Sequence, residues 1–128
     1  MNAFEGNARY AEEAKLRWGD TEAYRQSEAK AARRTGEQQA ELNRAMDGLM
    51  AEFARCREAG HAPDGDVARE LVAAWQAFLT EHYYDCTDAI LAGLGAMYAA
   101  DERFKKNIDR HGEGTARFMS DAIAAYCR

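Results

Sequence analysis

The sequence has almost none of the residues that interrupt helices. It contains a single proline, Pro63, in 128 residues, and it has no long run of β-branched residues. Proline removes a backbone hydrogen-bond donor and clashes with the preceding turn, so its scarcity leaves most of the chain free to form helix. Alanine, glutamate, arginine, leucine and methionine favour helix, and they are frequent throughout. The composition therefore predicts an all-α protein.

The sequence also lacks a long apolar run, an excess of positive charge and a paired set of cysteines. No window approaches the roughly 18 consecutive apolar residues that a membrane span needs. A net charge of −5 disfavours binding to nucleic acid, which requires a clustered positive face. The three cysteines (Cys56, Cys86 and Cys127) are an odd number without a paired spacing, and no secretion signal opens the chain. We therefore expect one soluble, cytoplasmic domain with reduced thiols and neither a membrane nor nucleic acid as partner.

Two strong helices are predicted in the middle of the chain. The first begins at a capping box formed by Thr35 and Gln38, in which two backbone donors are satisfied reciprocally. Its apolar residues recur at spacings of three and four: Leu42, Met46, Leu49, Phe53 and Cys56. The second helix is capped by Asp64 or Asp66. It repeats the spacing with Val67, Leu71, Trp75, Phe78 and His82. The short connection between the two helices predicts that they pack as an antiparallel pair.

The residues before this pair are predicted to be weakly anchored. A helix over residues 22–33, capped by Asp20 or Thr21, carries one aromatic residue and four alanines as its apolar content. At roughly 25 cal/mol per Å² of buried apolar surface, this helix gains little from packing. We therefore treat residues 1–34 as a loosely ordered, lid-like segment and residues 35–128 as the stable helical core.

Three more helices are predicted in the last third of the chain. The first carries Gly93 and Gly95. Each glycine destabilises a helix by about 1 kcal/mol relative to alanine, so its presence inside a helix calls for a structural explanation. In an interior helix such glycines let another backbone or a ligand approach closely, and close packing is the commoner cause. Asp101 and Thr115 are the predicted N-caps of the two shorter helices that follow. The whole chain is thus expected to hold six or seven helices and no strand.

Candidate catalytic or metal-binding residues are few. His82 and Cys86 lie four residues apart, with Asp85 and Asp88 close by. Neither an oxyanion-hole element nor a zinc-ligand spacing accompanies them. The simpler interpretation is that His82 borders the apolar stripe and that Cys86 is a small buried apolar group. We therefore predict no catalytic residue, no metal and no cofactor, and keep a cysteine-dependent enzyme using Cys86 and His82 as a minor alternative.

Aromatic and methionine side chains are concentrated in the C-terminal half. They are Trp75, Phe78, Tyr83, Tyr84, Met97, Tyr98, Phe104, Phe118, Met119 and Tyr126. Their spacing alone predicts that most of them belong to the core. A tyrosine hydroxyl needs a polar partner or water, so a cluster of tyrosines is also compatible with the wall of a cleft.

Short motifs, in order along the chain, resemble the three signatures of one family. The matching segments are residues 17–24 (RWGDTEAY) with Gln26 and Ser27, residues 83–86 (YYDC), residues 93–98 (GLGAMY), residues 101–104 and residues 107–109. They resemble the TipAS antibiotic-recognition domain, the effector-binding half of MerR-type regulators that sense thiopeptides. Residues 2–6 resemble the segment that precedes this domain, so the resemblance covers nearly the whole chain.

The resemblance implies a globin-like helical bundle with a deep apolar cleft, whose N-terminal helices are loosely ordered until a drug arrives and then close over it. The implied ligand is a thiopeptide or another bulky apolar antibiotic, which the domain senses or sequesters without turning it over. The winged helix and coiled coil that precede this domain in full-length regulators are not in this chain. It is therefore expected to be a monomer that does not bind DNA.

Ligand-binding roles are assigned on this basis. Trp18 and Tyr24 are expected to come down as a lid over the ligand. The wall is expected to consist of Trp75, Phe78, Tyr83, Tyr84, Met97, Tyr98 and Phe104. The amide N–H groups of the ligand are expected to donate to Asp85, Asp88 and Asp109. Thiopeptides contain dehydroalanine, which a thiolate attacks, so a slow adduct at Cys86 is expected as a minor route beside non-covalent capture.

A helical interaction module is the main alternative to a drug-binding domain. In that case the apolar stripe from Leu42 to Cys56 docks a partner helix in a homodimer. The oligomeric state distinguishes the two, because a drug sensor without its coiled coil is expected to be monomeric.

Overall fold

The computed structural model describes residues 21–128, and every regular element among them is a helix. The six described helices are α2 (Glu22–Ala32), α3 (Gly36–Glu58), α4 (Asp66–His82), α5 (Asp88–Ala100), α6 (Glu102–Asp109) and α7 (Thr115–Tyr126). The predicted all-α fold is confirmed. None of the described helices is long and apolar enough to cross a membrane.

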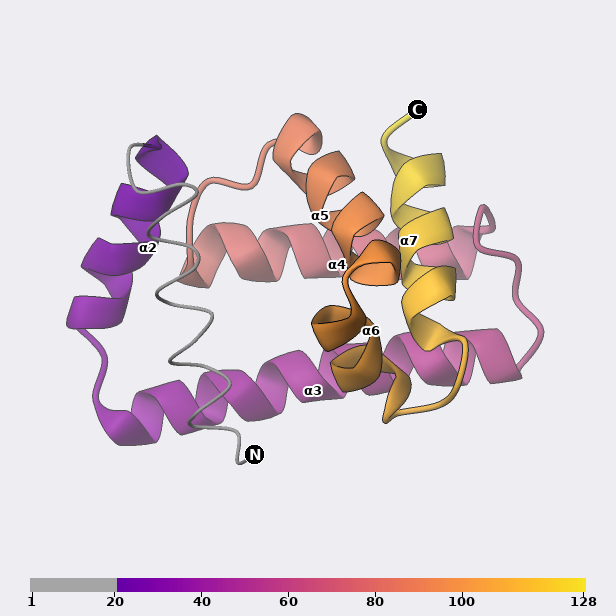
Figure 1. The fold of residues 1–128 in the computed structure, drawn as a ribbon, viewed down its shortest axis with the longest axis horizontal. Helices are drawn as coiled ribbons and strands as arrows, with labels where there is room; N and C mark the ends of the chain where they lie inside the picture. The colour runs from indigo at the N-terminus through magenta and orange to yellow at the C-terminus, as the bar shows by residue number, and fades with distance from the viewer. Residues whose placement is uncertain (1–20) are drawn as a thin grey trace.

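The two longest helices, α3 and α4, lie side by side and run in opposite directions, as the short connection between them predicts (Figure 1). α5, α6 and α7 pack across this pair, and α5 and α7 contact each other most extensively. α2 stands apart from them, at the end of the molecule where α3 begins and α4 ends. The body of the fold is therefore α3 to α7, with α2 beside one end of it.

The core lies where α3, α4, α5 and α7 meet. Its largest fully buried apolar side chains are Trp75, Phe53, Leu91, Ile108, Met119, Ile123 and Val72. Phe53 and Tyr98 each make an edge-on contact with the Trp75 ring system, at centroid distances of 6.3 and 6.0 Å. This geometry is favoured because the positive edge of one aromatic ring meets the negative face of another. The aromatic contacts thus join α3, α4 and α5 at one point.

Side-chain hydrogen bonds confirm three of the predicted helix starts. The Thr21 hydroxyl accepts a backbone N–H of the first turn of α2 at 3.1 Å. Thr35 and Gln38 form both hydrogen bonds of the capping box that starts α3. Asp101 caps α6 by accepting the Arg103 N–H at 2.9 Å. Each of these starts depends on residues no more than three apart, which explains why local sequence predicts them.

Two predicted caps are wrong. α4 begins after Gly65, and Asp66 is already its first residue, so neither Asp64 nor Asp66 caps it. α7 begins after Gly114, whose φ of 92° lies in the left-handed region that favours glycine. Thr115 is therefore the first residue of α7, and its hydroxyl donates to a carbonyl of the preceding turn at 2.6 Å. At both places a tight turn closed by backbone hydrogen bonds precedes the helix.

The buried face of α4 is one residue away from the predicted one. The buried residues of α4 are Ala68, Val72, Trp75 and Leu79. Val67, the first residue of the apolar stripe that the spacing predicts, is 40% exposed. α4 carries two overlapping apolar stripes that share Trp75, and the stripe that also holds Val72 and Leu79 faces the core. Phe78 and His82, from the other stripe, lie at the end of the molecule beside α2.

Gly95 lies where α5 meets α7. A Cβ atom at this position would lie 2.7 Å from the Cγ2 atom of Ile123, which is closer than carbon atoms pack. The glycine therefore allows the two helices to approach, as close packing requires. Gly93 has no neighbouring atom within 4 Å of an equivalent Cβ, so close packing does not explain it.

Candidate ligand-binding cleft

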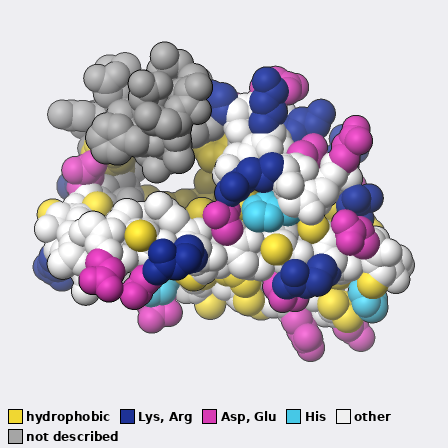
Figure 2. Space-filling view, turned by 90° about the horizontal axis from the view of Figure 1, so that it is seen from below, with side chains coloured by type: hydrophobic (Ala, Val, Ile, Leu, Met, Phe, Trp, Pro, Cys, Tyr) yellow, Lys and Arg dark blue, Asp and Glu magenta, His cyan; other side chains and the backbone are white. Residues whose placement is uncertain are grey.

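An open cleft of about 520 Å³ lies at the end of the molecule where α2 ends, α3 begins and α4 ends. Its described lining residues are Arg33, Arg34, Gln38, Glu41, Leu42, Ala45, Phe78 and His82. Figure 2 looks at the molecule from the α3 side and shows a hollow in the surface with hydrophobic side chains along it. Residues 33–45 and residues 78–82, which are distant in the sequence, thus form one concave surface.

The cleft combines apolar and hydrogen-bonding side chains. Leu42, Ala45 and Phe78 contribute carbon surface, while Gln38 and Glu41 contribute polar groups. Ligand sites commonly have volumes of about 300–1,000 Å³ and mix a largely apolar lining with a few polar groups that orient the ligand. The cleft therefore suits a ligand with a large apolar body that also carries hydrogen-bonding groups.

Aromatic side chains gather at the end of α4. The ring centroid of Phe78 lies 4.8 Å from that of His82 and 6.2 Å from that of Tyr83. The guanidinium carbon of Arg34 lies over the Tyr83 ring, 4.9 Å from its centroid, as a cation–π contact. These contacts restrict the side chains of Phe78 and Arg34 where both line the cleft.

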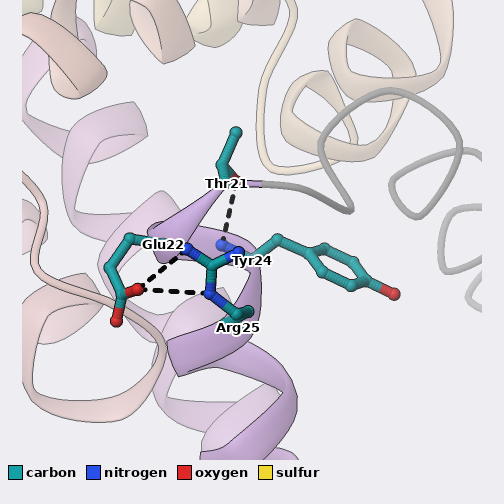
Figure 3. A network of polar contacts seen from close by, with 4 residues as sticks. All are labelled: Thr21, Glu22, Tyr24 and Arg25. Atoms are coloured by element: carbon teal, nitrogen blue, oxygen red, sulfur yellow. Dashed lines mark hydrogen bonds and ion pairs between the residues drawn. The ribbon is translucent and has the colours of Figure 1, made fainter.

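The first turn of α2 is held by its own side chains (Figure 3). The Arg25 Nη2 and Nε atoms donate to one carboxylate oxygen of Glu22 at 3.0 and 3.2 Å. The Tyr24 ring points away from this pair, and its hydroxyl donates to Glu28 at 2.9 Å. Tyr24, one of the two predicted lid residues, thus lies on α2, and its side chain is half-buried. Trp18, the other, falls outside the described residues.

The family model of the TipAS antibiotic-recognition domain matches residues 10–126. The chain belongs to this family. The match covers nearly the whole chain and confirms the resemblance that the short motifs carry.

Two kinds of transcriptional activator are similar in sequence to this TipAS domain. The HTH-type transcriptional activators TipA of Streptomyces coelicolor and Streptomyces lividans are each 38% identical to it over 116 residues, which is 91% of this chain and 46% of theirs. The HTH-type transcriptional activator mta of Bacillus subtilis is 42% identical over 67 residues, which is 52% of this chain and 26% of that protein. The chain thus spans about half the length of its TipA relatives, and the part of it that matches mta spans 26% of that protein.

Two solved structures share the fold. TipAS of Streptomyces lividans in complex with nosiheptide superposes with a TM-score of 0.85 at 37% identity, covering 94% of this chain and 84% of that one. The antibiotic binding domain of a TipA-class multidrug resistance transcriptional regulator superposes with a TM-score of 0.62 at 32% identity, covering 67% of this chain and 92% of that one. The fold of this chain is therefore the TipAS fold.

The aromatic residues predicted to form the wall of the cleft are divided between cleft and core. Phe78 lines the cleft, and Tyr83 contacts it. Trp75 and Tyr98 lie in the core, 1% and 5% exposed. Phe104 packs against that core, with its ring centroid 5.7 Å from that of Tyr98. Of these five residues, Phe78 is thus the one among the described lining residues of the cleft.

The two remaining predicted wall residues are partly buried. Tyr84 packs against the core cluster, and burial raises the pKa of its phenol, so the hydroxyl stays neutral. Met97 is half-buried near the end of α5. A ligand-binding role for either residue stays a prediction.

Two of the three acidic residues that were predicted to accept hydrogen bonds from a ligand accept hydrogen bonds within the protein. The Asp109 carboxylate accepts the Ala116 N–H at 2.8 Å and so supports the first turn of α7. The Asp88 carboxylate accepts from the side-chain amide of Gln76 at 2.9 Å. Asp85 is exposed. None of these three acidic residues is among the described residues that line the cleft, and their contact with a ligand stays a prediction.

Seven described lining residues were not predicted to bind a ligand. They are Arg33, Arg34, Gln38, Glu41, Leu42, Ala45 and His82. The arginines belong to a mixed-charge stretch that is typical of a solvated helix face, and Leu42 and His82 sit on stripes that predict core. No signal in the sequence separates these residues from ordinary surface or core positions, because their shared property is that α2, α3 and α4 meet there.

Cys86 is buried, with 4% of its surface exposed. Burial raises the pKa of its thiol to about 11, and the nearby Cys127, Asp85 and Asp88 add to the effect. The thiol therefore stays protonated at neutral pH, and a protonated thiol is a poor nucleophile. His82 lies on the cleft, and its Nε2 atom is 3.6 Å from a carboxylate oxygen of Glu81. In residues 21–128 no group of three or more acidic, histidine or cysteine side chains is arranged to hold a metal ion.

Proposed function

We propose that this TipAS domain binds thiopeptides or other bulky apolar antibiotics in the cleft between α2, α3 and α4, and that it does not turn them over. The observation that carries the proposal is the superposition of 94% of the chain on TipAS in complex with nosiheptide, with a TM-score of 0.85. The mixed apolar and polar lining of the 520 Å³ cleft supports it. The protonated state of Cys86 supports capture that is mainly non-covalent.

The biological setting follows from the relatives. Because the TipA relatives are transcriptional activators and the chain spans 46% of their length, we infer that it acts as the antibiotic-sensing part of such a regulator or as a stand-alone antibiotic-binding protein. A regulator of this kind works in the cytoplasm, and the three free cysteines fit a reducing compartment. The net charge of −5 supports a domain that does not itself bind nucleic acid.

A monomer is the proposed state of the isolated chain. The stripe of α3 that a homodimer would need is used inside the chain, because Phe53 and Cys56 are buried in the core and Leu42 is 9% exposed. Met46 and Leu49 are packed against the same core. An apolar face that is already covered has little surface left for a partner helix.

The proposed role of residues 1–34 is that of a lid. α2, which belongs to this segment, has no buried residue, so its attachment to the body depends on few contacts. A segment that buries little surface opens more easily than the core. A bulky ligand held between α2 and the body would therefore stabilise the closed position of α2.

Titration with nosiheptide tests the proposal. We expect a dissociation constant in the micromolar range or lower for the chain as it stands. Phe78→Ala removes apolar surface from the cleft and is expected to raise the dissociation constant about tenfold or more. Val67→Ala is the matched control, because Val67 also lies on α4 but is exposed and outside the lining. Absence of binding to nosiheptide and thiostrepton would refute the proposed function, and equal losses in the two variants would place the ligand elsewhere.

A further inference from the structure

The polar side chains that line the cleft are mainly hydrogen-bond donors. Arg33 and Arg34 follow directly after α2, and Gln38 lies in the first turn of α3. A guanidinium group donates and does not accept, and it stays positively charged at neutral pH. Glu41 is the one acidic side chain among the described lining residues. The described lining thus carries two permanent positive charges and one negative charge.

The two arginine side chains have N–H groups that no other residue uses. The Arg34 guanidinium lies over the Tyr83 ring at 4.9 Å, and its Nη1 atom donates to Gln39 Oε1 at 3.2 Å. That hydrogen bond uses one N–H of a group that has several. The Arg33 side chain is exposed and has neither a hydrogen bond nor an ion pair with another residue of the described part of the chain. Both guanidinium groups therefore have donors left for a ligand.

Gln38 adds a further donor. Its Oε1 atom accepts the backbone N–H of Thr35 at 2.9 Å, as part of the capping box of α3. The oxygen and the nitrogen of a side-chain amide point in different directions, so the nitrogen is the group directed away from the cap. An amide nitrogen only donates. Gln38 therefore has the same polarity toward a ligand as the two arginines.

The predicted acidic acceptors are not part of the described lining. Asp85, Asp88 and Asp109 are not among the described residues that line the cleft, which leaves Glu41 as the one carboxylate there. A ligand that accepts hydrogen bonds, and above all one that carries negative charge, suits this lining better than a ligand that donates them.

We propose that Arg33 and Arg34 are specificity-determining residues, which raise the affinity of the cleft for bulky apolar ligands that carry an anionic group, relative to neutral ligands of the same shape. A carboxylate, sulfonate or phenolate accepts charge-assisted hydrogen bonds from a guanidinium, and these are about twice as strong as hydrogen bonds between neutral groups. The apolar body of such a ligand contacts Leu42, Ala45 and Phe78. The inference rests on the proposed function, in which this cleft is the ligand-binding site.

Two fluorescent probes that differ by one sulfonate group test the inference. Anilinonaphthalenesulfonate is anionic, and phenylnaphthylamine has the same ring system without the sulfonate. The readout is the dissociation constant of the neutral probe divided by that of the anionic probe, because this ratio cancels the apolar contribution that both share. Arg33→Gln is expected to lower the ratio about two- to fivefold. Glu41→Gln removes the negative charge and is expected to raise it about twofold.

Two controls accompany these variants. Arg44→Gln changes the net charge of the chain by the same amount as Arg33→Gln, but Arg44 is an exposed residue of α3 outside the described lining. We expect it to leave the ratio unchanged. Phe78→Ala removes apolar surface from the cleft and is expected to weaken the binding of both probes, which places them there. A folding defect cannot explain opposite changes of the ratio in Arg33→Gln and Glu41→Gln.

Three results would overturn the inference. The first is a ratio that Arg33→Gln leaves at the wild-type value. The second is an equal fall in Arg33→Gln and Arg44→Gln, which would show that the net charge of the whole chain decides the preference. The third is probe binding that is absent from the wild-type chain or unaffected by Phe78→Ala, because the cleft would then not hold the probes.

Titration of the wild-type chain with nosiheptide separates this inference from the proposed function. If nosiheptide does not bind and the ratio changes as expected, the proposed antibiotic binding fails and the charge preference of the cleft stands. If nosiheptide binds and displaces both probes while Arg33→Gln leaves the ratio unchanged, the proposed function stands and the inference fails.

Discussion

The indole N–H of Trp75 donates a hydrogen bond to the hydroxyl oxygen of Tyr98, with 3.3 Å between the two heavy atoms. Trp75 lies on α4 and Tyr98 on α5, and both side chains are buried. A buried donor without an acceptor costs more than the hydrogen bond itself contributes. The hydroxyl of Tyr98 is thus part of the core, where Trp75 supplies the polar partner that a buried tyrosine needs.

Tyr98→Phe is expected to lower the free energy of unfolding by about 1 to 2 kcal/mol, because it leaves the Trp75 N–H without its acceptor. Urea unfolding followed by circular dichroism measures the change. Tyr24→Phe, which removes a hydroxyl from α2, is the control and is expected to change stability by less than about 0.5 kcal/mol. A Tyr98→Phe protein as stable as the wild type would show that the indole N–H finds another partner.

Gly95 and Gly93 form a matched pair on α5. Gly95→Ala places a methyl group 2.7 Å from Cγ2 of Ile123 and is expected to lower the free energy of unfolding by about 1 to 3 kcal/mol. Gly93→Ala meets no atom within 4 Å and is expected to raise it by about 0.5 to 1 kcal/mol, because alanine favours helix. Thermal unfolding of both variants checks the prediction. Equal effects of the two substitutions would contradict the close approach of α5 and α7.

Gln76 joins three parts of the molecule through its side-chain amide. The amide nitrogen donates to the Cys86 carbonyl and to the Asp88 carboxylate, both at 2.9 Å, and the amide oxygen accepts from the Tyr126 hydroxyl at 3.1 Å. Gln76→Glu turns the donor into an acceptor that faces two other acceptors.

We expect Gln76→Glu to lower the free energy of unfolding at neutral pH by about 2 kcal/mol or more, and Gln76→Met, which only removes the polar groups, by about 1 kcal/mol. Chemical denaturation of both variants at the same pH measures the difference. The prediction fails if the glutamate variant is the more stable of the two.

Cys86 gives a prediction for alkaline pH. Its pKa in the folded protein is about 11, above the ordinary value of 9.0, so the folded state favours the protonated thiol. The sign follows from proton binding: below pH 9 both states hold the proton and no stability is lost, whereas between pH 9 and 11 the unfolded state releases it first and folding stability falls.

Cys86→Ala removes this contribution. Relative to its own stability at pH 8, the variant is expected to lose about 1 to 2 kcal/mol less than the wild type when the pH rises to 11. Denaturant unfolding at the two pH values measures the difference. The buried tyrosines, which both proteins share, cancel in it apart from their charge interaction with Cys86. Parallel pH profiles would show that the Cys86 thiol titrates normally in the folded protein.

The sequence by itself determined the helical class, the starts of α2, α3 and α6, and the family. Caps depend on residues within one turn of each other, so Thr35 and Gln38 predict the start of α3 without knowledge of the rest of the fold. The family motifs are likewise short segments whose order along the chain is enough to recognise them. The antiparallel pairing of α3 and α4 follows from the short connection between two apolar stripes.

Only the tertiary structure decided which stripe of α4 faces the core and where the cleft lies. Val67 and Ala68 are both apolar neighbours in the sequence, and the packing of α3 and α7 against one side of α4 buries Ala68 and leaves Val67 exposed. The cleft depends on α2 being placed beside the end of α4, which Lys30 does through backbone carbonyls about 50 residues away. A carbonyl oxygen is the same in every residue type, so no residue type in that segment marks it as the partner of Lys30.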